Sequence, residues 1–316
     1  MIPPYIPIVL AFTPNYVVPA ATTILSVLDN LAPNFKLKVI CLSSQPLSEE
    51  IKEMLYTISK ERLSFSFIDL SKKHLNVNIN NRFTEAALYR LLLPDLLPYE
   101  DKVIYLDSDV IVRTDLSKLF FQANLDGYYL AAVVEATLPF QEEYINNLGL
   151  KPGEYINSGF LILNLKKLRE ENVVRKLLEE SNVEGLLFPD QDAINKVCQG
   201  KILPIQPIYN SIRTFFLPQY KKTFLKYYKE EDWEAIQSYG NIHYTGGKPW
   251  KMYTVQFDKW WDYYERLPAV LKKNSLFSKS QRIYFLYKLL KINICREFFL
   301  LAQNIYRFLR YKNVNT

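Results

Sequence analysis

Two aspartates, Asp107 and Asp109, stand two positions apart directly after the short apolar segment 102–106. Strand side chains alternate with a period of two, so this spacing predicts two carboxylates on one side of an extended segment. Two like charges held together repel each other unless a cation lies between them. A hard divalent ion, Mg2+ or Mn2+, would bridge both carboxylates to a diphosphate. The alternative is a solvated turn or a helix cap, because an isolated Asp-x-Asp pair is common.

A second group of candidate residues lies in the segment His-Tyr-Thr-Gly-Gly-Lys-Pro-Trp at 243–250. His243 offers an imidazole ligand to a borderline metal such as Mn2+. Gly246 lets backbone amides approach a ligand closely, and Lys248 can meet a phosphate as a point charge. Read alone, the segment is more typical of a glycine turn with a surface lysine. The other histidine, His74, is interpreted as a solvated loop residue.

A third group combines amide, hydroxyl and carboxylate side chains. Asn157-Ser158-Gly159 is interpreted as a polar corner before the apolar strand 160–165, which is suited to binding sugar hydroxyls. Asp190 and Asp192 are further candidates, with the alternative that they cap a helix that begins near Ala193. Gln191 stands between them and has no capping role.

The elements that must position these residues alternate along the chain. Apolar runs predict strands, and apolar residues at steps of three and four predict helices. The expected strands are 6–12, 36–42, 64–70 and 102–106, and the expected helices are 16–31, 48–60 and 84–93, the last ending before Pro94. This alternation predicts an α/β fold with a parallel sheet covered by helices. Ligands gather at the carboxyl ends of such strands, where Asp107 and Asp109 stand.

Composition narrows the protein class. The 316 residues are 49% hydrophobic and 15% aromatic, enough for one large core. The first glycine is Gly127, so no glycine-rich dinucleotide or P-loop motif can lie in the first four elements. Three scattered cysteines predict neither a zinc site nor a disulfide framework. The N-terminus lacks signal-peptide features and no apolar run approaches 18 residues, which predicts a cytoplasmic protein.

Together these segments resemble the bacterial family 8 glycosyltransferases of the GT-A fold, which include lipooligosaccharide galactosyltransferases and are related to glycogenin. The matching segments follow the family's order over about 240 residues, which is far more specific than any one motif. They are 11–16, 89–90, 105–112, 157–159 with 164–165, 190–192 and 243–250. The resemblance implies a mostly parallel, Rossmann-like sheet flanked by helices that binds a nucleotide-diphospho-sugar.

The resemblance also implies a role for each matching residue. Mn2+, with Mg2+ as the alternative, would be coordinated by Asp107, Asp109 and His243 together with the donor diphosphate. The uridine and ribose would be lined by Ala11, Thr13, Asn15, Tyr16 and Ser108. The donor sugar would be held by Arg90, Asn157, Ser158, Asp190 and Gln191, and the phosphates covered by Gly246 and Lys248.

The activity implied by the resemblance is retaining transfer of galactose or glucose from a UDP-sugar to a saccharide or glycolipid acceptor in cell-surface glycan synthesis. Gln191 is an amide and a poor nucleophile, which favours front-face attack by the acceptor hydroxyl over double displacement. Asp190 is the alternative nucleophile. Two positions depart from the family: Thr13 stands where many relatives have an acidic residue, and Glu135 stands where an aspartate is usual on the acceptor side.

Two other functions fit parts of the pattern. A sugar nucleotidyltransferase also uses a carboxylate pair at a strand end, but it usually has a glycine-rich basic loop after the first strand, and residues 13–16 (Thr-Pro-Asn-Tyr) are not one. A catalytically inactive carbohydrate-binding or membrane-binding relative is the non-enzymatic alternative. The intact acids Asp107 and Asp109 favour an active enzyme.

Residues 268–316 form the expected basic helical appendage to a catalytic domain at 1–267. The appendage holds ten Lys and Arg residues against the single acid Glu297, a charge of +9 in a chain of net +6. Its apolar residues recur at steps of three and four, at Ile283, Tyr287, Leu290, Ile294, Phe298, Leu301, Ile305 and Phe308. This predicts an interfacial helix on the anionic inner face of the membrane. The alternative is a pair of helices packed on the body, and no nucleic-acid motif accompanies the charge.

Overall fold

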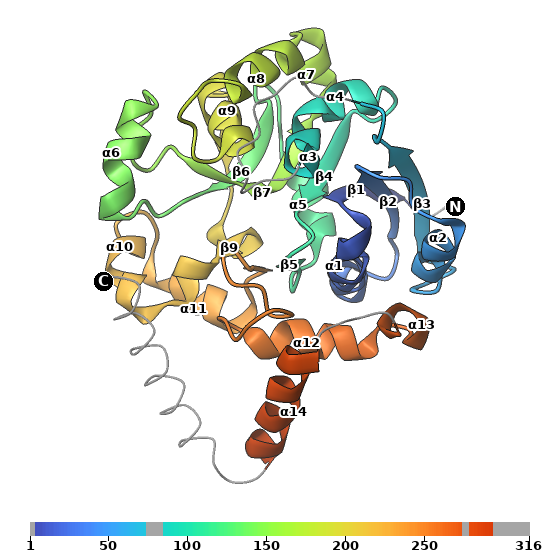
Figure 1. Ribbon diagram of the computed structural model, residues 1–316. Helices are drawn as coiled ribbons and strands as arrows, with labels where there is room; N and C mark the ends of the chain where they lie inside the picture. The colour runs from blue at the N-terminus through green and yellow to red at the C-terminus, as the bar shows by residue number, and fades with distance from the viewer. Residues whose placement is uncertain (1–3, 74–84, 274–277, 293–316) are drawn as a thin grey trace.

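The computed structural model describes residues 4–73, 85–273 and 278–292 (Figure 1). Its centre is a seven-stranded sheet with the order β3-β2-β1-β4-β7-β6-β8. The strands are β1 Tyr5–Phe12, β2 Lys36–Ser43, β3 Leu63–Asp69, β4 Lys102–Leu106, β6 Leu130–Val134, β7 Ile156–Asn164 and β8 Ile202–Pro204. Only β7 runs antiparallel to its neighbours β4 and β6, and the other pairs are parallel. The predicted mostly parallel α/β sheet is confirmed.

Alternate side chains of the central strands enter two different cores, one on each face of the sheet. Along β4, Ile104 and Leu106 belong to one core, and Val103 and Tyr105 belong to the other. Both sets are buried because helices cover both faces, as expected for a sheet with crossover connections. Burial of both faces explains why the sequences of these strands are apolar at nearly every position.

The first core contains buried side chains from helices α1 Val17–Asn30, α2 Glu49–Tyr56, α5 Leu116–Gln122, α10 Lys221–Phe224, α11 Glu230–Tyr239, α12 Phe257–Arg266, α13 Ala269–Lys272 and α14 Ser278–Ile292. The second contains those of α3 Glu85–Leu88, the 3-10 helix η2 Tyr89–Leu92, α4 Leu93–Leu96, α7 Leu165–Glu170, α8 Val173–Ser181 and α9 Pro189–Val197. Figure 1 shows α7, α8 and α9 at one end of the molecule and α12 to α14 at the other. Helix α6, Pro139–Asn147, contributes Ile145 to a small third cluster.

A three-stranded sheet, β5-β10-β9, brings the C-terminal half of the chain to the end of β4. Its strands are β5 Val110–Ile111, β9 Ser211–Ile212 and β10 Ile242–His243. In the antiparallel β5–β10 pair His243 lies opposite Val110, and in the parallel β10–β9 pair it lies beside Ile212. The small sheet therefore places His243 next to the two aspartates.

Three local predictions were wrong. Pro94 does not end its helix, because it lies in the first turn of α4, where proline loses no backbone hydrogen bond. Asn157-Ser158-Gly159 is part of β7 rather than a corner before it. Helix α9 begins at Pro189, four residues earlier than expected, so Asp190 and Gln191 lie in its first turn.

The start of the basic appendage packs on the body. In α14 the Tyr284 ring is buried and stacks on Trp261 of α12 at 5.7 Å, and its hydroxyl donates to Asp262 at 2.7 Å. Ile283, the first residue of the predicted apolar stripe, is exposed. The stripe from Ile294 onward lies outside the described residues. None of the helices that the structure describes is both long and apolar enough to cross a membrane.

Candidate active site

The two aspartates and His243 form one cluster at the carboxyl end of β4. One ligand atom from each of the three side chains lies within 4.8 Å of the others. His243 Nε2 is 3.6 Å from an Asp107 carboxylate oxygen and 3.4 Å from one of Asp109. The segment 107–109 is a turn, with the Val110 amide donating to the Asp107 carbonyl, rather than the extended segment predicted from the spacing. The turn directs both carboxylates toward His243.

The surroundings of the cluster fit a divalent metal ion. Two carboxylates and one imidazole are a set of ligands suited to Mn2+. Mg2+ prefers oxygen ligands and would be coordinated mainly by the two carboxylates. Gly159 leaves the space that brings the donors together, because a Cβ added there would lie 2.1 Å from His243 Cε1 and 2.8 Å from Asp107 Oδ2. Asp109 and His243 are buried, so water competes little for their donor atoms.

Three neighbouring side chains bind the same two carboxylates. Arg90 and the Tyr105 hydroxyl donate to Asp107 Oδ1 at 2.8 and 2.9 Å, and the Lys248 ammonium contacts Asp109. Although burial alone would raise the pKa of Asp109, Lys248 and His243 hold that pKa below its ordinary value. The carboxylate of Asp109 is therefore fully ionised at neutral pH and ready to act as a ligand.

On the β7 side of the cluster, the amide of Gln191 is firmly oriented. Its Oε1 accepts from the Ser158 amide at 3.0 Å and from Asn157 Nδ2 at 3.1 Å, and its Nε2 donates to Glu135 at 3.3 Å. Glu135 also accepts from Asn157 Nδ2 at 3.0 Å. Burial raises the pKa of Glu135. These residues lie beside the cluster of Asp107, Asp109 and His243, where a donor sugar is expected.

The two acids that flank Gln191 have different roles in the structure. Asp190 forms an ion pair with Arg90 at 3.2 Å and accepts from the Ser158 hydroxyl at 3.1 Å, so it faces the cluster. Asp192 is fully buried and accepts from the Phe188 amide at 2.9 Å and from two tyrosine hydroxyls, Tyr144 and Tyr155. The N-cap residue of α9 is Phe188, so the capping alternative is wrong for both acids; Asp192 lies inside the helix and holds its first turn by accepting from the Phe188 amide.

The end of β1 and the segment after β10 form the side of the site that the sequence predicts to bind the nucleotide. Ser108 Oγ lies 3.5 Å from the Ala11 carbonyl, and the Thr13 hydroxyl donates to Asn15. The Tyr16 ring packs edge-on against Trp250 at 5.9 Å. Gly246 has a left-handed backbone (φ 85°), a conformation that favours glycine. The residues from 11–16, 107–109 and 243–250 that the sequence singled out therefore converge on one site.

Sequence reasoning missed two residues that the structure places in the site. Gly159 provides the space beside His243, and the fully buried Asn210 contacts the His243 ring at 3.0 Å. Asn210 follows a proline-containing 3-10 turn, Pro207–Tyr209, and resembles an ordinary loop residue in the sequence. No signal in the sequence separates it from other asparagines. Gly159 belongs to the Asn157-Ser158-Gly159 motif, but the sequence does not show why a residue without a side chain is needed there.

Comparisons with known proteins identify relatives of this architecture. The sequence profile of glycosyl transferase family 8 matches residues 7–254. General stress protein A of Bacillus subtilis (strain 168) is 25% identical over 249 residues, 76% of this chain and 85% of that protein. Lipopolysaccharide 1,2-glucosyltransferase of Escherichia coli (strain K12) is 34% identical over 181 residues, 55% of this chain and about half (51%) of that protein.

Solved structures show the same fold. The galactosyltransferase LgtC, in complex with donor and acceptor sugar analogs, has a TM-score of 0.67 at 23% identity, over 83% of this chain and 96% of that chain. The bifunctional glycosyltransferase WbbM has a TM-score of 0.73 at 23% identity, over 88% of this chain and 52% of that chain. The fold predicted from the sequence, GT-A, is confirmed.

Proposed function

Because the chain belongs to glycosyl transferase family 8, we propose that it is a retaining hexosyltransferase that moves galactose or glucose from a UDP-sugar to a saccharide acceptor in cell-surface glycan synthesis. The observation that carries the proposal is the cluster of Asp107, Asp109 and His243, whose ligand atoms lie within 4.8 Å of one another. The intact cluster favours an active enzyme over a relative that has lost turnover.

The three residues of this cluster would hold Mn2+ against the donor diphosphate. When bound, the ion would neutralise the charge that develops on the leaving phosphate. Lys248 lies beside Asp109 and would supply a second positive charge on the same side. Uridine and ribose would lie along Ala11, Thr13, Asn15, Tyr16 and Ser108, under the turn at Gly246.

At the sugar, the contacts favour front-face attack. The acceptor hydroxyl oxygen would bond to the anomeric carbon as the bond from that carbon to the phosphate oxygen breaks, and the departing oxygen would take the hydroxyl proton. Gln191 is a neutral amide whose oxygen already accepts from the Ser158 amide and Asn157. Asp190 is paired with Arg90, which makes it a weak nucleophile and suits it to orienting sugar hydroxyls. Glu135 would lie toward the acceptor.

The test of this function is slow hydrolysis and transfer with a panel of UDP-sugars in Mn2+, with the configuration of the product read by NMR. We expect one UDP-hexose to be preferred and an α-linked product or α-anomeric sugar to appear first. Gln191→Ala should slow the reaction without abolishing it, because the amide orients the sugar and forms no bond to it. A β-configured product would contradict the retaining mechanism, and turnover of a nucleoside triphosphate with a sugar phosphate would favour a nucleotidyltransferase.

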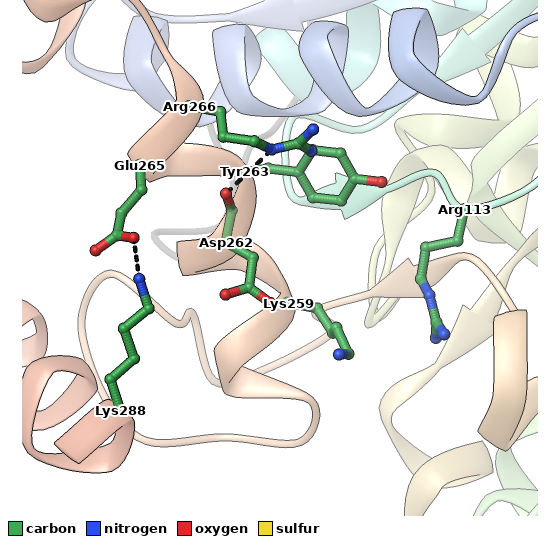
Figure 2. Close-up of a pocket in the computed structure, with 7 residues that line it drawn as sticks. All are labelled: Arg113, Lys259, Asp262, Tyr263, Glu265, Arg266 and Lys288. Carbon is green, nitrogen blue, oxygen red and sulfur yellow. Dashed lines mark hydrogen bonds and ion pairs between the residues drawn. The ribbon is translucent and has the colours of Figure 1, made fainter. Parts of the chain in front are cut away.

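We further propose that the basic appendage attaches the enzyme to an anionic membrane surface, the inner face of the cytoplasmic membrane, where a lipid-linked acceptor would be found. On α14 the side chains of Ile283, Phe285 and Leu286 are exposed. An open cavity of about 460 Å3 lies between α14, α12 and the segment after β5. Figure 2 shows four cationic side chains around it, Arg113, Lys259, Arg266 and Lys288, together with Asp262, Tyr263 and Glu265.

Sedimentation with vesicles tests this attachment. At about 1 kcal/mol for each basic residue near anionic lipid, the full chain is expected to sediment with acidic vesicles at low salt, to stay in solution with neutral ones, and to be released by high salt. Replacing both Phe285 and Leu286 with serine should weaken binding, since two exposed apolar side chains are lost. Tyr99→Ser, at another exposed aromatic side chain, is the matched control. A chain that ignores acidic vesicles at low salt would leave only the packed-helix alternative.

A further inference from the structure

A chain of hydrogen-bonded side chains joins the metal cluster to Gln191. His243 Nδ1 lies 3.0 Å from Asn210 Oδ1, and Asn210 Nδ2 donates to Asn157 Oδ1 at 2.9 Å. Asn157 Nδ2 in turn donates to Gln191 Oε1 at 3.1 Å. All four residues are buried. Nothing in the proposed function uses Asn210, although it links His243 to Asn157.

The backbone fixes the direction of every amide in this chain. The Gly159 amide can only donate, and it donates to Asn157 Oδ1 at 3.1 Å. Asn157 must therefore turn its Nδ2 toward Gln191 and Glu135. Asn157 Oδ1 faces the Asn210 side chain at 2.9 Å, a distance at which two carbonyl oxygens would repel each other. Asn210 must therefore direct its Nδ2 toward Asn157. The Asn210 oxygen is then left for His243.

This arrangement determines which nitrogen of His243 can bind a metal. An acceptor at Nδ1 requires that Nδ1 carry the proton, so the lone pair of the neutral ring lies on Nε2. Nε2 is the atom that faces Asp107 and Asp109 at 3.6 and 3.4 Å. A partner on the second ring nitrogen is the usual way in which proteins orient a metal-binding histidine and set its tautomer.

Resting on the proposed function, we propose that Asn210 is a positioning residue that sets the metal-binding tautomer of His243 and ties the metal cluster to the amide of Gln191. The oxygen and the nitrogen of the Asn210 side-chain amide have separate roles. The carbonyl oxygen serves the metal ligand, and the amide nitrogen serves Asn157 and, through it, the sugar side. The backbone places it there because Asn210 directly precedes β9, which pairs with β10 beside His243.

The two tasks separate in two variants. Asn210→Ala removes both and is expected to weaken Mn2+ binding about 10- to 100-fold, the usual cost of losing the partner of a metal ligand. Asn210→Asp keeps an acceptor for Nδ1 and should bind Mn2+ more tightly than Asn210→Ala does. The same Asn210→Asp protein loses the donor to Asn157 and should turn over the donor sugar more slowly at saturating Mn2+. Mn2+ affinity is measured from the EPR signal of unbound Mn2+, without substrate.

Two reference variants complete the experiment. Asn164→Ala also removes a side-chain amide that both donates and accepts a hydrogen bond. Because Asn164 lies at the end of β7 far from Asn157, this change should leave Mn2+ affinity unchanged. His243→Ala should lose Mn2+ affinity strongly. If Asn210→Ala binds Mn2+ as the wild type does, or if both Asn210 variants lose the same affinity, the role proposed for Asn210 is wrong. If His243→Ala also binds normally, the metal site itself is wrong.

Discussion

Asp109→Ala is expected to reduce the rate of sugar transfer by more than about 100-fold. This exceeds the usual loss when a residue that only hydrogen-bonds to a metal ligand is removed. The change removes one of three donor groups and also the carboxylate that holds the Lys248 ammonium. Binding of UDP in Mn2+ should weaken in parallel, because the ion and the lysine both act on the diphosphate. The measurements are initial rates with the preferred UDP-hexose and calorimetric titration with UDP.

The fold should survive this change. Asp109 lies on a turn after β4, and the apolar side chains of β4 keep both cores in place. Asp101→Ala is the matched control at the other end of the same strand, since the exposed ion pair of Asp101 with Arg169 is worth at most about 1 kcal/mol. Full activity of the Asp109→Ala protein in the presence of a chelator would overturn the proposed mechanism.

Gly159→Ala is expected to lose Mn2+ binding and transfer almost completely, although it changes no proposed ligand. The added Cβ would lie 2.1 Å from His243 Cε1 and 2.8 Å from both His243 Nδ1 and Asp107 Oδ2. Both ligands must move apart, and the His243 ring must also leave Asn210. The stability cost is that of an overpacked interior, about 1–3 kcal/mol. Thermal unfolding and Mn2+ titration measure the two effects separately.

Gly127→Ala provides the comparison for this variant. Gly127 has a left-handed backbone (φ 81°) but no atom within 4 Å of an added Cβ, so alanine costs about 1–2 kcal/mol of backbone strain without touching the site. The two proteins should be destabilised to a similar degree and differ sharply in Mn2+ affinity. A Gly159→Ala protein that is folded and binds Mn2+ normally would show that the close approach of His243 is not needed.

The sequence predicted the first strands and helices well because their signals are local. Residues 6–12, 39–42 and 103–106 are apolar on both faces, and the structure buries both faces of these parts of β1, β2 and β4. The start of α9 was misplaced because Asp190 and Asp192 were considered as caps of a helix near Ala193, whereas Pro189 is the first helical residue, where the fixed backbone of proline favours a helix.

The candidate site was predicted as a set of residues but not as an arrangement. The family motifs named Gln191 and Asn157, yet their mutual hydrogen bond joins positions 34 apart in the chain. Asn210 and His243 meet because β9 pairs with β10, and that pairing depends on a small second sheet whose strands are only two residues long. A strand of two residues is too short to show an alternating apolar pattern, so the sequence does not predict it.

The ion pairs of Arg90 with Asp107 and of Lys248 with Asp109 have a consequence for how the protein matures. A buried carboxylate without a partner is costly, and many metal-binding domains cannot fold until their ion arrives. Here the chain supplies its own counter-charges, so a newly made polypeptide would be able to complete both cores before any metal ion is bound. Loading of the proposed metal would thereby be uncoupled from folding, and scarcity of the metal would leave a reservoir of intact, dormant protein that is ready for use when the supply returns.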